Sequence, residues 1–180
     1  NLNKNDEIIL TIAEHHANFV PWQYIARSKG AILKIVYFDP DKDFDVSEIR
    51  NLITTKTKLI AFPHVSNVLG TVFPVEEICS LAKQAGAISL VDGCQGAIHF
   101  KVDVKKIGCD FYCFSGHKLY GPTGVGVLYG KNDVILNMPP FMCGGDMIDV
   151  VKIEETSFAD PPLRFEAGTP PIVQAIVLGK

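Results

Sequence analysis

The stretch KLIAFPHVSNVLGTVFPVEEICSLAKQAGAISLVD, residues 58–92, decides the fold class because it contains a strand, a helix and a second strand in succession. Residues 58–64 and 88–92 are apolar runs of strand length. Residues 74–85 between them have a helical period, with proline at the first position and two acidic residues in the first turn. Two strands joined by a helix of this length are typical of a parallel pair.

The same alternation continues on both sides of this stretch. Apolar runs predict further strands at residues 7–13, 32–38, 111–114 and 125–129, and helices at residues 19–29 and 45–53. Near-continuous apolar strands separated by helices predict an α/β fold: a mostly parallel sheet covered by helices on both faces. From about Met138 the pattern becomes irregular, with Pro139-Pro140, Gly144-Gly145 and Pro161-Pro162.

Composition narrows the classes of function. The 180 residues are 47% hydrophobic and 21% charged, which predicts one soluble globular domain. A net charge of -3 gives no electrostatic case for a nucleic acid or an anionic membrane as partner, and no apolar run reaches the roughly 20 residues that span a bilayer. Five scattered cysteines, an odd number, favour reduced thiols and a cytoplasmic location over a disulfide framework.

Polar or ionisable side chains follow four of the predicted strands. The segments that carry them read EHHAN, HVSNVLG, VDGCQG and SGHK. Ligands of parallel α/β sheets bind outside the carboxyl ends of the strands, so this convergence predicts a binding site there. The residues concerned are His15, His16, Ser66, Asn67, Asp92, Gln95, Ser115, His117 and Lys118.

Each of these residues also has a purely structural interpretation. Asp92 at a strand end is equally suited to capping a helix. His15 and His16 are adjacent, and on an extended chain they point to opposite sides, which argues against a metal pair. Cys109 and Cys113 are too far apart along a strand to form a zinc pair, so we expect no metal site.

A lysine, a carboxylate, an imidazole and several hydroxyl or imidazole donors together match the needs of pyridoxal 5'-phosphate. A lysine amine forms the Schiff base with the cofactor aldehyde. A carboxylate keeps the pyridine nitrogen protonated, which makes the ring an electron sink. An imidazole can stack on the ring, and the remaining donors can bind the phosphate. Asp92 and Lys118 follow neighbouring strands, as this arrangement requires.

The segments EHHANFVPWQ, HVSNVLGTVFPV, VDGCQGAIH, DFYCFSGHKLYGPTGVGVLYG, GGDMI and TSFADPPLRFEAGTP resemble, in order, the Suf-type (group II) cysteine desulfurases and selenocysteine lyases of the class-V aminotransferase family. The resemblance extends over essentially the whole chain. It implies the fold-type I large domain of pyridoxal-phosphate-dependent transferases, with a seven-stranded mixed sheet, and a homodimer with two shared active sites.

By this resemblance Lys118 is the Schiff-base lysine and Asp92 is the partner of the pyridinium nitrogen. Gln95 is the donor to the phenolic oxygen of the ring. His15 stacks on the ring and takes part in proton transfer, and Asn67 lies close to the substrate and the ring oxygen.

The resemblance also implies how the phosphate is held. Ser115 and His117 match phosphate ligands, and Thr169 matches a threonine that reaches the phosphate bound by the other subunit.

In the family the substrate is L-cysteine or selenocysteine. Sulfur passes to an enzyme cysteine as a persulfide, alanine leaves, and an acceptor protein carries the sulfur to iron–sulfur cluster assembly. The resemblance implies the same here, in the cytoplasm or in an organelle stroma or matrix. Another class-V enzyme, such as an aminotransferase or a kynureninase-like lyase, and a non-catalytic binding fragment are the alternatives.

Some features depart from the family pattern. We expect residues 1–180 to be the cofactor-binding large domain, truncated at both ends, with the small domain, the persulfide cysteine and the arginine for the substrate carboxylate outside the chain. Cys94 and Gly96 stand where alanines are usual, which we interpret as a tolerated exchange of small residues. Cys143 stands where glycine is usual. We predict that none of the five cysteines carries the catalytic persulfide.

Overall fold

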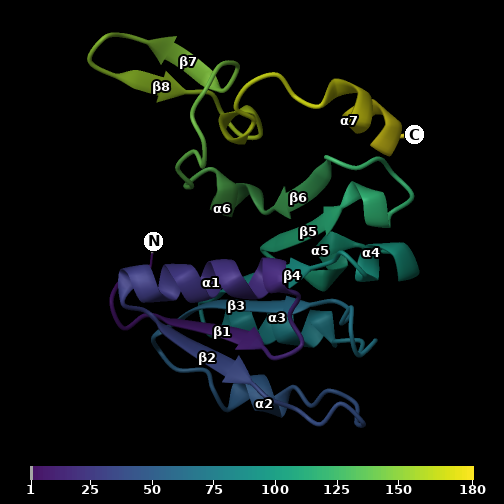
Figure 1. Ribbon diagram of the computed structural model, residues 1–180. Helices are drawn as coiled ribbons and strands as arrows, with labels where there is room; N and C mark the ends of the chain where they lie inside the picture. Colours follow the sequence, from purple (N-terminus) through teal and green to yellow (C-terminus); the bar gives the residue numbers. More distant parts are fainter. Residues whose placement is uncertain (1) are drawn as a thin grey trace.

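A six-stranded sheet forms the centre of the computed structural model, which describes residues 2–180 (Figure 1). The strand order is β2-β1-β3-β4-β5-β6. The first five strands in this order pair in parallel, and β6 is antiparallel to β5. The strands are β1 (Glu7–Thr11), β2 (Ile32–Val36), β3 (Thr57–Pro63), β4 (Ile88–Asp92), β5 (Phe111–Ser115) and β6 (Gly126–Gly130).

The predicted α/β class and the mainly parallel sheet are confirmed, but the predicted number of strands is wrong. The central sheet has six strands within residues 2–180, not seven. The two further strands, β7 (Ile148–Val151) and β8 (Thr156–Phe158), pair with each other in a separate antiparallel hairpin. Figure 1 places this hairpin beyond β6, at the opposite end of the molecule from β2. Within the irregular sequence after Met138, this hairpin therefore projects beyond the central sheet.

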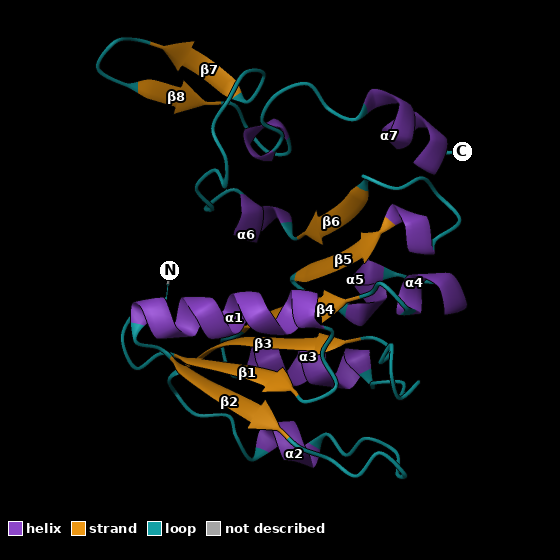
Figure 2. Ribbon diagram, in the orientation of Figure 1, coloured by secondary structure: helices purple, strands orange, loops and turns teal. Residues whose placement is uncertain are grey.

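Helices cover both faces of the sheet (Figure 2). The long helix α1 packs on one face, while α2, α3 and α5 pack on the other. The helices are α1 (His16–Lys29), α2 (Ser47–Arg50), α3 (Val75–Gln84), α4 (Gly96–His99), α5 (Val104–Ile107), α6 (Asn132–Ile135) and α7 (Ile172–Leu178), with short 3₁₀ turns η1 (Gly116–Lys118) and η2 (Leu163–Phe165). No helix in the described part of the chain has the length and apolarity needed to cross a bilayer.

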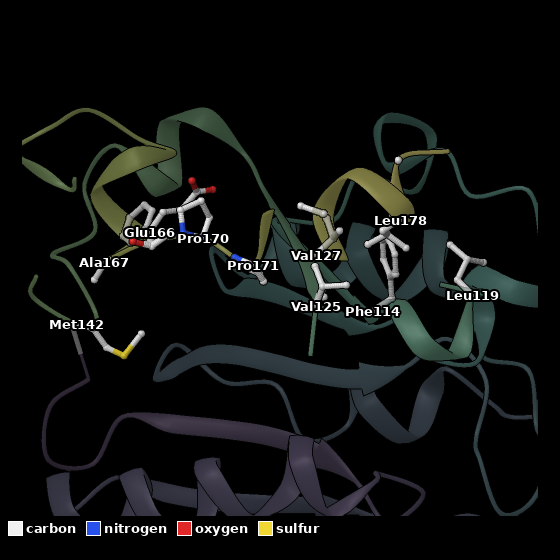
Figure 3. Close-up of a pocket in the computed structure, with 16 residues that line it drawn as sticks. Phe114, Leu119, Val125, Val127, Met142, Glu166, Ala167, Pro170, Pro171 and Leu178 are labelled. Carbon is white, nitrogen blue, oxygen red and sulfur yellow. The ribbon is translucent and has the colours of Figure 1, made fainter. Parts of the chain in front are cut away.

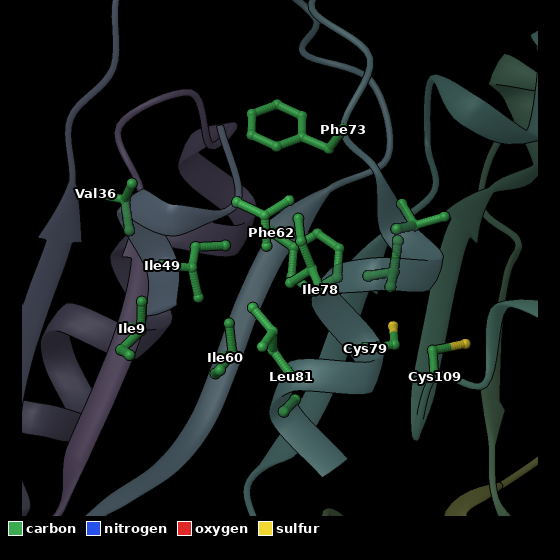
Figure 4. Close-up of a cluster of buried hydrophobic side chains, with 14 of the residues drawn as sticks. Ile9, Val36, Ile49, Ile60, Phe62, Phe73, Ile78, Cys79, Leu81 and Cys109 are labelled. Atoms are coloured by element: carbon green, nitrogen blue, oxygen red, sulfur yellow. The ribbon is translucent and has the colours of Figure 1, made fainter. Parts of the chain in front are cut away.

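Alternating side chains of the strands build two separate cores. On β1, Ile8 and Leu10 face α1, whereas Ile9 faces the layer that contains α3. The larger core continues through Ile60 and Phe62 of β3, and none of these five side chains is exposed (Figure 4). A strand buried on both faces needs apolar residues at every position, which explains why β1 and β3 read as continuous apolar runs.

The ends of α1 follow from local chemistry. Gly30 ends the helix in the left-handed conformation, with φ of 66°, as the sequence predicts. The helix begins at His16, three residues before the predicted start, because His15 caps it: its Nδ1 accepts a hydrogen bond from the Ala17 amide at 3.1 Å. Histidine is not a common capping residue, so this start could not be predicted from the residue type.

We predict that Phe62→Ala destabilises the full-length protein by about 3–5 kcal/mol, because a fully buried ring is removed from the larger core. The measurement is urea-induced unfolding followed by circular dichroism. Tyr24→Ala is the control: Tyr24 is 73% exposed on α1, so we expect a change within about 0.5 kcal/mol. Equal effects of the two substitutions would contradict the assignment of Phe62 to the core.

Candidate active site

A small cleft lies at the carboxyl ends of the parallel strands. It gathers residues that follow four different strands, β1, β3, β4 and β5. Five of the eight predicted site residues line it, together with three neighbours: His15, Asn67, Asp92, Gln95 and Lys118, with Pro63, Val65 and Cys94. The structure therefore brings these five side chains together at one edge of the sheet, as the sequence predicted.

Asp92 is the last residue of β4 and forms the most buried acid of the cleft, with 8% of its surface exposed. The Cys94 amide donates to Asp92 Oδ1 at 2.9 Å and so fixes the carboxylate. The backbone is held from both sides, because the His64 amide donates to the Asp92 carbonyl at 2.8 Å and the Gly93 amide donates to the Cys113 carbonyl at 2.7 Å. The strand end that carries the carboxylate is thus rigidly placed.

His15 lies at the junction of β1 and α1. Its Nδ1 is the acceptor in the cap of α1, so in the neutral imidazole the proton resides on Nε2. The cap also fixes the position of the ring relative to the helix. An imidazole held in this way presents an N–H group at a defined place in the cleft.

Lys118 is the last residue of η1, the 3₁₀ turn that follows β5. The turn packs closely against the strand that follows it: a Cβ on Gly116 would lie 3.0 Å from Val125 Cγ1 and from the Val125 carbonyl oxygen. Within residues 2–180 the Lys118 amine has no ion-pair partner, whereas Lys131 is bound by Asp110 at 2.8 Å. Lys118 therefore brings an amine into the cleft that no carboxylate of the described residues neutralises.

Comparison with known proteins identifies the family. The Aminotransferase class-V family matches residues 1–180. The chain belongs to the class-V aminotransferase family. A probable cysteine desulfurase of a Synechocystis strain is 50% identical over 179 residues, which are 99% of this chain and 43% of that protein. The chain thus spans less than half the length of the curated relatives that it matches.

Solved structures agree with this assignment. A crystal structure of a cysteine desulfurase from Escherichia coli superposes with a TM-score of 0.95 at 42% identity, covering 99% of this chain and 45% of that chain. A cystine C–S lyase, solved in complex with its product cysteine persulfide, superposes with a TM-score of 0.89 at 28% identity, covering 99% of this chain and 49% of that one. These class-V similarities extend over nearly the whole chain.

Three residues that the class-V resemblance assigns to phosphate binding lie outside the cleft lining. The Ser115 Oγ is 3.7 Å from the Cys94 Sγ, so Ser115 borders the cleft. His117 is exposed on η1. Thr169 lies in a different, larger and mainly apolar cavity of about 650 Å³ that runs along β6 and α7 (Figure 3). The roles of these three residues stay predictions.

The sequence analysis missed three polar residues beneath the cleft. Glu14 accepts hydrogen bonds at 2.7 Å from both the Thr11 hydroxyl and the Asn18 amide. His64 Nδ1 and the Tyr112 hydroxyl lie 2.9 Å apart, and burial lowers the pKa of His64 and raises that of Tyr112. Glu14 and His64 stand beside predicted site residues in EHHAN and HVSN, which was an available signal. Tyr112 had none, because a tyrosine inside an apolar strand is typical of a core.

Four of the five cysteines are unsuited to nucleophilic chemistry. Burial raises the pKa of Cys79 to about 12, that of Cys109 to about 11 and that of Cys113 to about 12. The pKa of Cys94 is also raised, by burial and by the adjacent Asp92. A thiol is a nucleophile only as the thiolate, so these groups are unreactive near neutral pH. Cys143 differs, since it is exposed.

Gly96, which we interpreted as a tolerated exchange for alanine, fits here because the packing leaves no room for a larger residue. A Cβ at position 96 would overlap the His64 imidazole, and a Cβ at position 93 would overlap the Tyr112 ring. The pair His64–Tyr112 therefore occupies the space directly beneath the turn that follows Asp92. Alanine, the usual residue at position 96 in the family, requires His64 to take another position.

We predict that Gly96→Ala destabilises the full-length protein by about 1–3 kcal/mol, because the added methyl group displaces His64 from Tyr112. The measurement is thermal and urea-induced unfolding. Gly145→Ala is the matched control, because a Cβ at position 145 meets open space. A Gly96→Ala protein as stable as the parent would show that the His64 ring moves without cost.

Proposed function

We propose that the chain is the cofactor-binding part of a pyridoxal 5'-phosphate-dependent cysteine desulfurase. The overall reaction of the full-length protein breaks the Cβ–Sγ bond of L-cysteine, leaves the sulfur on an enzyme thiol as a persulfide, and releases L-alanine. The observation that carries the proposal is the cleft in which Lys118, Asp92, Gln95, His15 and Asn67 meet. The cysteine desulfurases among its relatives support the same reaction.

The residues of the cleft fit the cofactor chemically. Lys118 supplies an amine for the cofactor aldehyde, and Asp92 supplies a carboxylate for the pyridine nitrogen. Gln95 and Asn67 supply amide groups for the ring oxygen and the substrate, and His15 supplies an imidazole for the ring face. When bound, the cofactor supplies an electron sink for the charge that develops at the substrate α-carbon.

The protein groups then have separate tasks. Asp92 retains a proton at the ring nitrogen, and the Cys94 amide orients its carboxylate for this. The Lys118 amine accepts and returns the proton of the substrate α-carbon, and His15, protonated at Nε2, donates a hydrogen bond or a proton within the cleft. Each task uses an atom whose position is set by a strand end or a helix cap.

Finer features of the proposal rest on the resemblance to the Suf-type group. We propose a homodimer in which Thr169 serves the phosphate of the partner subunit, with Ser115 and His117 as phosphate ligands in their own subunit. Thr169 is exposed and lines a different cavity from the cleft, which supports a role toward another chain.

We further propose activity on selenocysteine and delivery of sulfur to an acceptor protein for iron–sulfur clusters. We also propose a cytoplasmic location, which the five free cysteines support.

A second candidate reaction is favoured by one observation. The cystine C–S lyase has the same fold at 28% identity, so the cleft also suits a lyase that releases a persulfide product. A lyase needs no enzyme thiol to accept sulfur. Persulfide on the protein after incubation with L-cysteine favours the desulfurase; free cysteine persulfide after incubation with cystine favours the lyase.

We predict that borohydride reduction of the full-length protein with pyridoxal 5'-phosphate attaches the cofactor to Lys118, because this amine lies with Asp92 in the cleft. The label is located by peptide mass spectrometry. Lys118→Ala should lose the label, and Lys101→Ala, which changes an exposed lysine, should retain it. Label on Lys101 or Lys131 in the parent protein would refute the assignment.

We predict that Cys143→Gly leaves desulfurase activity of the full-length protein unchanged, because Cys143 lies outside the cleft although it is exposed. Persulfide is mapped by mass spectrometry after addition of L-cysteine, and we expect it on none of the five cysteines of this chain. Persulfide on Cys143, together with loss of activity in the variant, would overturn this prediction.

A further inference from the structure

The turn between β1 and α1 is fixed by a chain of side-chain hydrogen bonds centred on Glu14. The Trp22 indole Nε1 donates to Asn18 Oδ1 at 3.0 Å, and the Asn18 Nδ2 donates to Glu14 Oε2 at 2.7 Å. Glu14 Oε1 lies 2.7 Å from the Thr11 hydroxyl. The chain links the last residue of β1 to the second turn of α1 and therefore encloses the position of His15.

The Trp22 indole determines which groups in this series of hydrogen bonds donate and which accept. An indole N–H can only donate, so Asn18 must accept through Oδ1 and must donate through Nδ2. Glu14 Oε2 is consequently always an acceptor. At the other oxygen the Thr11 hydroxyl can donate to a carboxylate or accept from a carboxylic acid. The network therefore accommodates two forms of Glu14: an ionised carboxylate that accepts from both donors, and a neutral acid that carries its proton on Oε1 and donates to Thr11.

The surroundings favour this neutral form. Burial raises the pKa of Glu14 to about 8, and the charge of Asp92 on β4 contributes in the same direction. The Cys113 thiol on β5 also faces Glu14, and its own pKa is raised to about 12, so it is uncharged. On the same turn the adjacent ionisable group is His15, the cap of α1. A negative charge on Glu14 would be opposed by burial first and by the charge of Asp92 in addition.

We propose that Glu14 is a positioning residue of the cofactor site: as a neutral acid it locks the turn that presents His15, and it leaves Asp92 as the carboxylate charge of the cleft. The role rests on the proposed function, because it assigns Glu14 to the site that binds pyridoxal 5'-phosphate. Glu14 itself does not line the cleft.

Two substitutions in the full-length protein separate charge from position. Glu14→Gln mimics the neutral acid: its carbonyl accepts from Asn18 and its amide donates to Thr11. Glu14→Leu leaves both partners unsatisfied. The affinity for pyridoxal 5'-phosphate is measured by fluorescence titration at pH 7. We expect the Gln variant to remain within about twofold of the parent and the Leu variant to bind about tenfold or more weakly. Glu77→Gln, on the exposed surface of α3, is the control and should have no effect.

A pH profile provides a readout that a purely structural role would not change. Ionisation of Glu14 adds a second negative charge beside Asp92, so the affinity of the parent protein should change with a midpoint near pH 8. The Gln variant should lack this step. A parent profile without the step, or a Gln variant that binds as weakly as the Leu variant, would overturn the proposal.

The cofactor-free protein gives an independent check. The folded-state pKa of Glu14 is raised above its ordinary value of 4.5, so the stability linked to this proton is present at low pH and is lost as the pH rises toward 8. Between pH 6 and pH 9 the melting temperature of the parent should therefore fall more than that of the Gln variant. If the melting temperatures of the parent and of the Gln variant fell equally, the neutral form of Glu14 would be refuted, whatever borohydride labelling shows for Lys118. If they fell unequally but Lys118 were not labelled, only the proposed function would be refuted.

Discussion

The parallel pairing of β4 with β3 and β5 is the constraint on which the rest of the site depends. Backbone hydrogen bonds from the His64 amide to Asp92 and from the Gly93 amide to Cys113 continue the sheet past the last residue of β4. These bonds hold the backbone of Asp92, a residue with 8% of its surface exposed. Asn67 and Lys118 follow the neighbouring strands β3 and β5, and His15 follows β1, which pairs with β3. The parallel register thus brings all these groups to a common edge.

The same sheet register also restricts the size of the residues in the turn that follows Asp92. The turn after Asp92 lies so close to Tyr112 and His64 that neither Gly93 nor Gly96 has room for a Cβ. The His64 ring is held between the Tyr112 hydroxyl and the Phe100 ring, which stacks on it at a centroid distance of 5.2 Å. Buried polar groups that are satisfied in this way make a rigid support, because any shift would leave one of them without a partner.

The sequence predicted those parts of the structure that have a local signal. Continuous apolar strands, helix periods and polar residues at strand ends were sufficient for the α/β class and for the cleft around Asp92 and Lys118. The number seven came from the family resemblance, whereas the apolar runs themselves predicted the six strands that the sheet contains within residues 2–180. The short, exposed strands β7 and β8 pair only with each other and had no apolar pattern that could predict them. The contact between Gly96 and His64 joins residues that are 32 positions apart, and it depends on the sheet register. The sequence has no local signal for such a contact, so it could not be predicted.

Two acidic residues beside one cleft illustrate how environment separates residues of the same chemistry. Asp92 receives the Cys94 amide and faces the cleft, so its negative charge is supported by a donor and by the groups that enter there. Glu14 is enclosed by Thr11 and Asn18, and its pKa rises to about 8. Desolvation and the nearby charge of Asp92 act together on Glu14. The fold thus gives these two acids different surroundings, and the sequence motif EHHAN joins Glu14 directly to the histidine of the cleft.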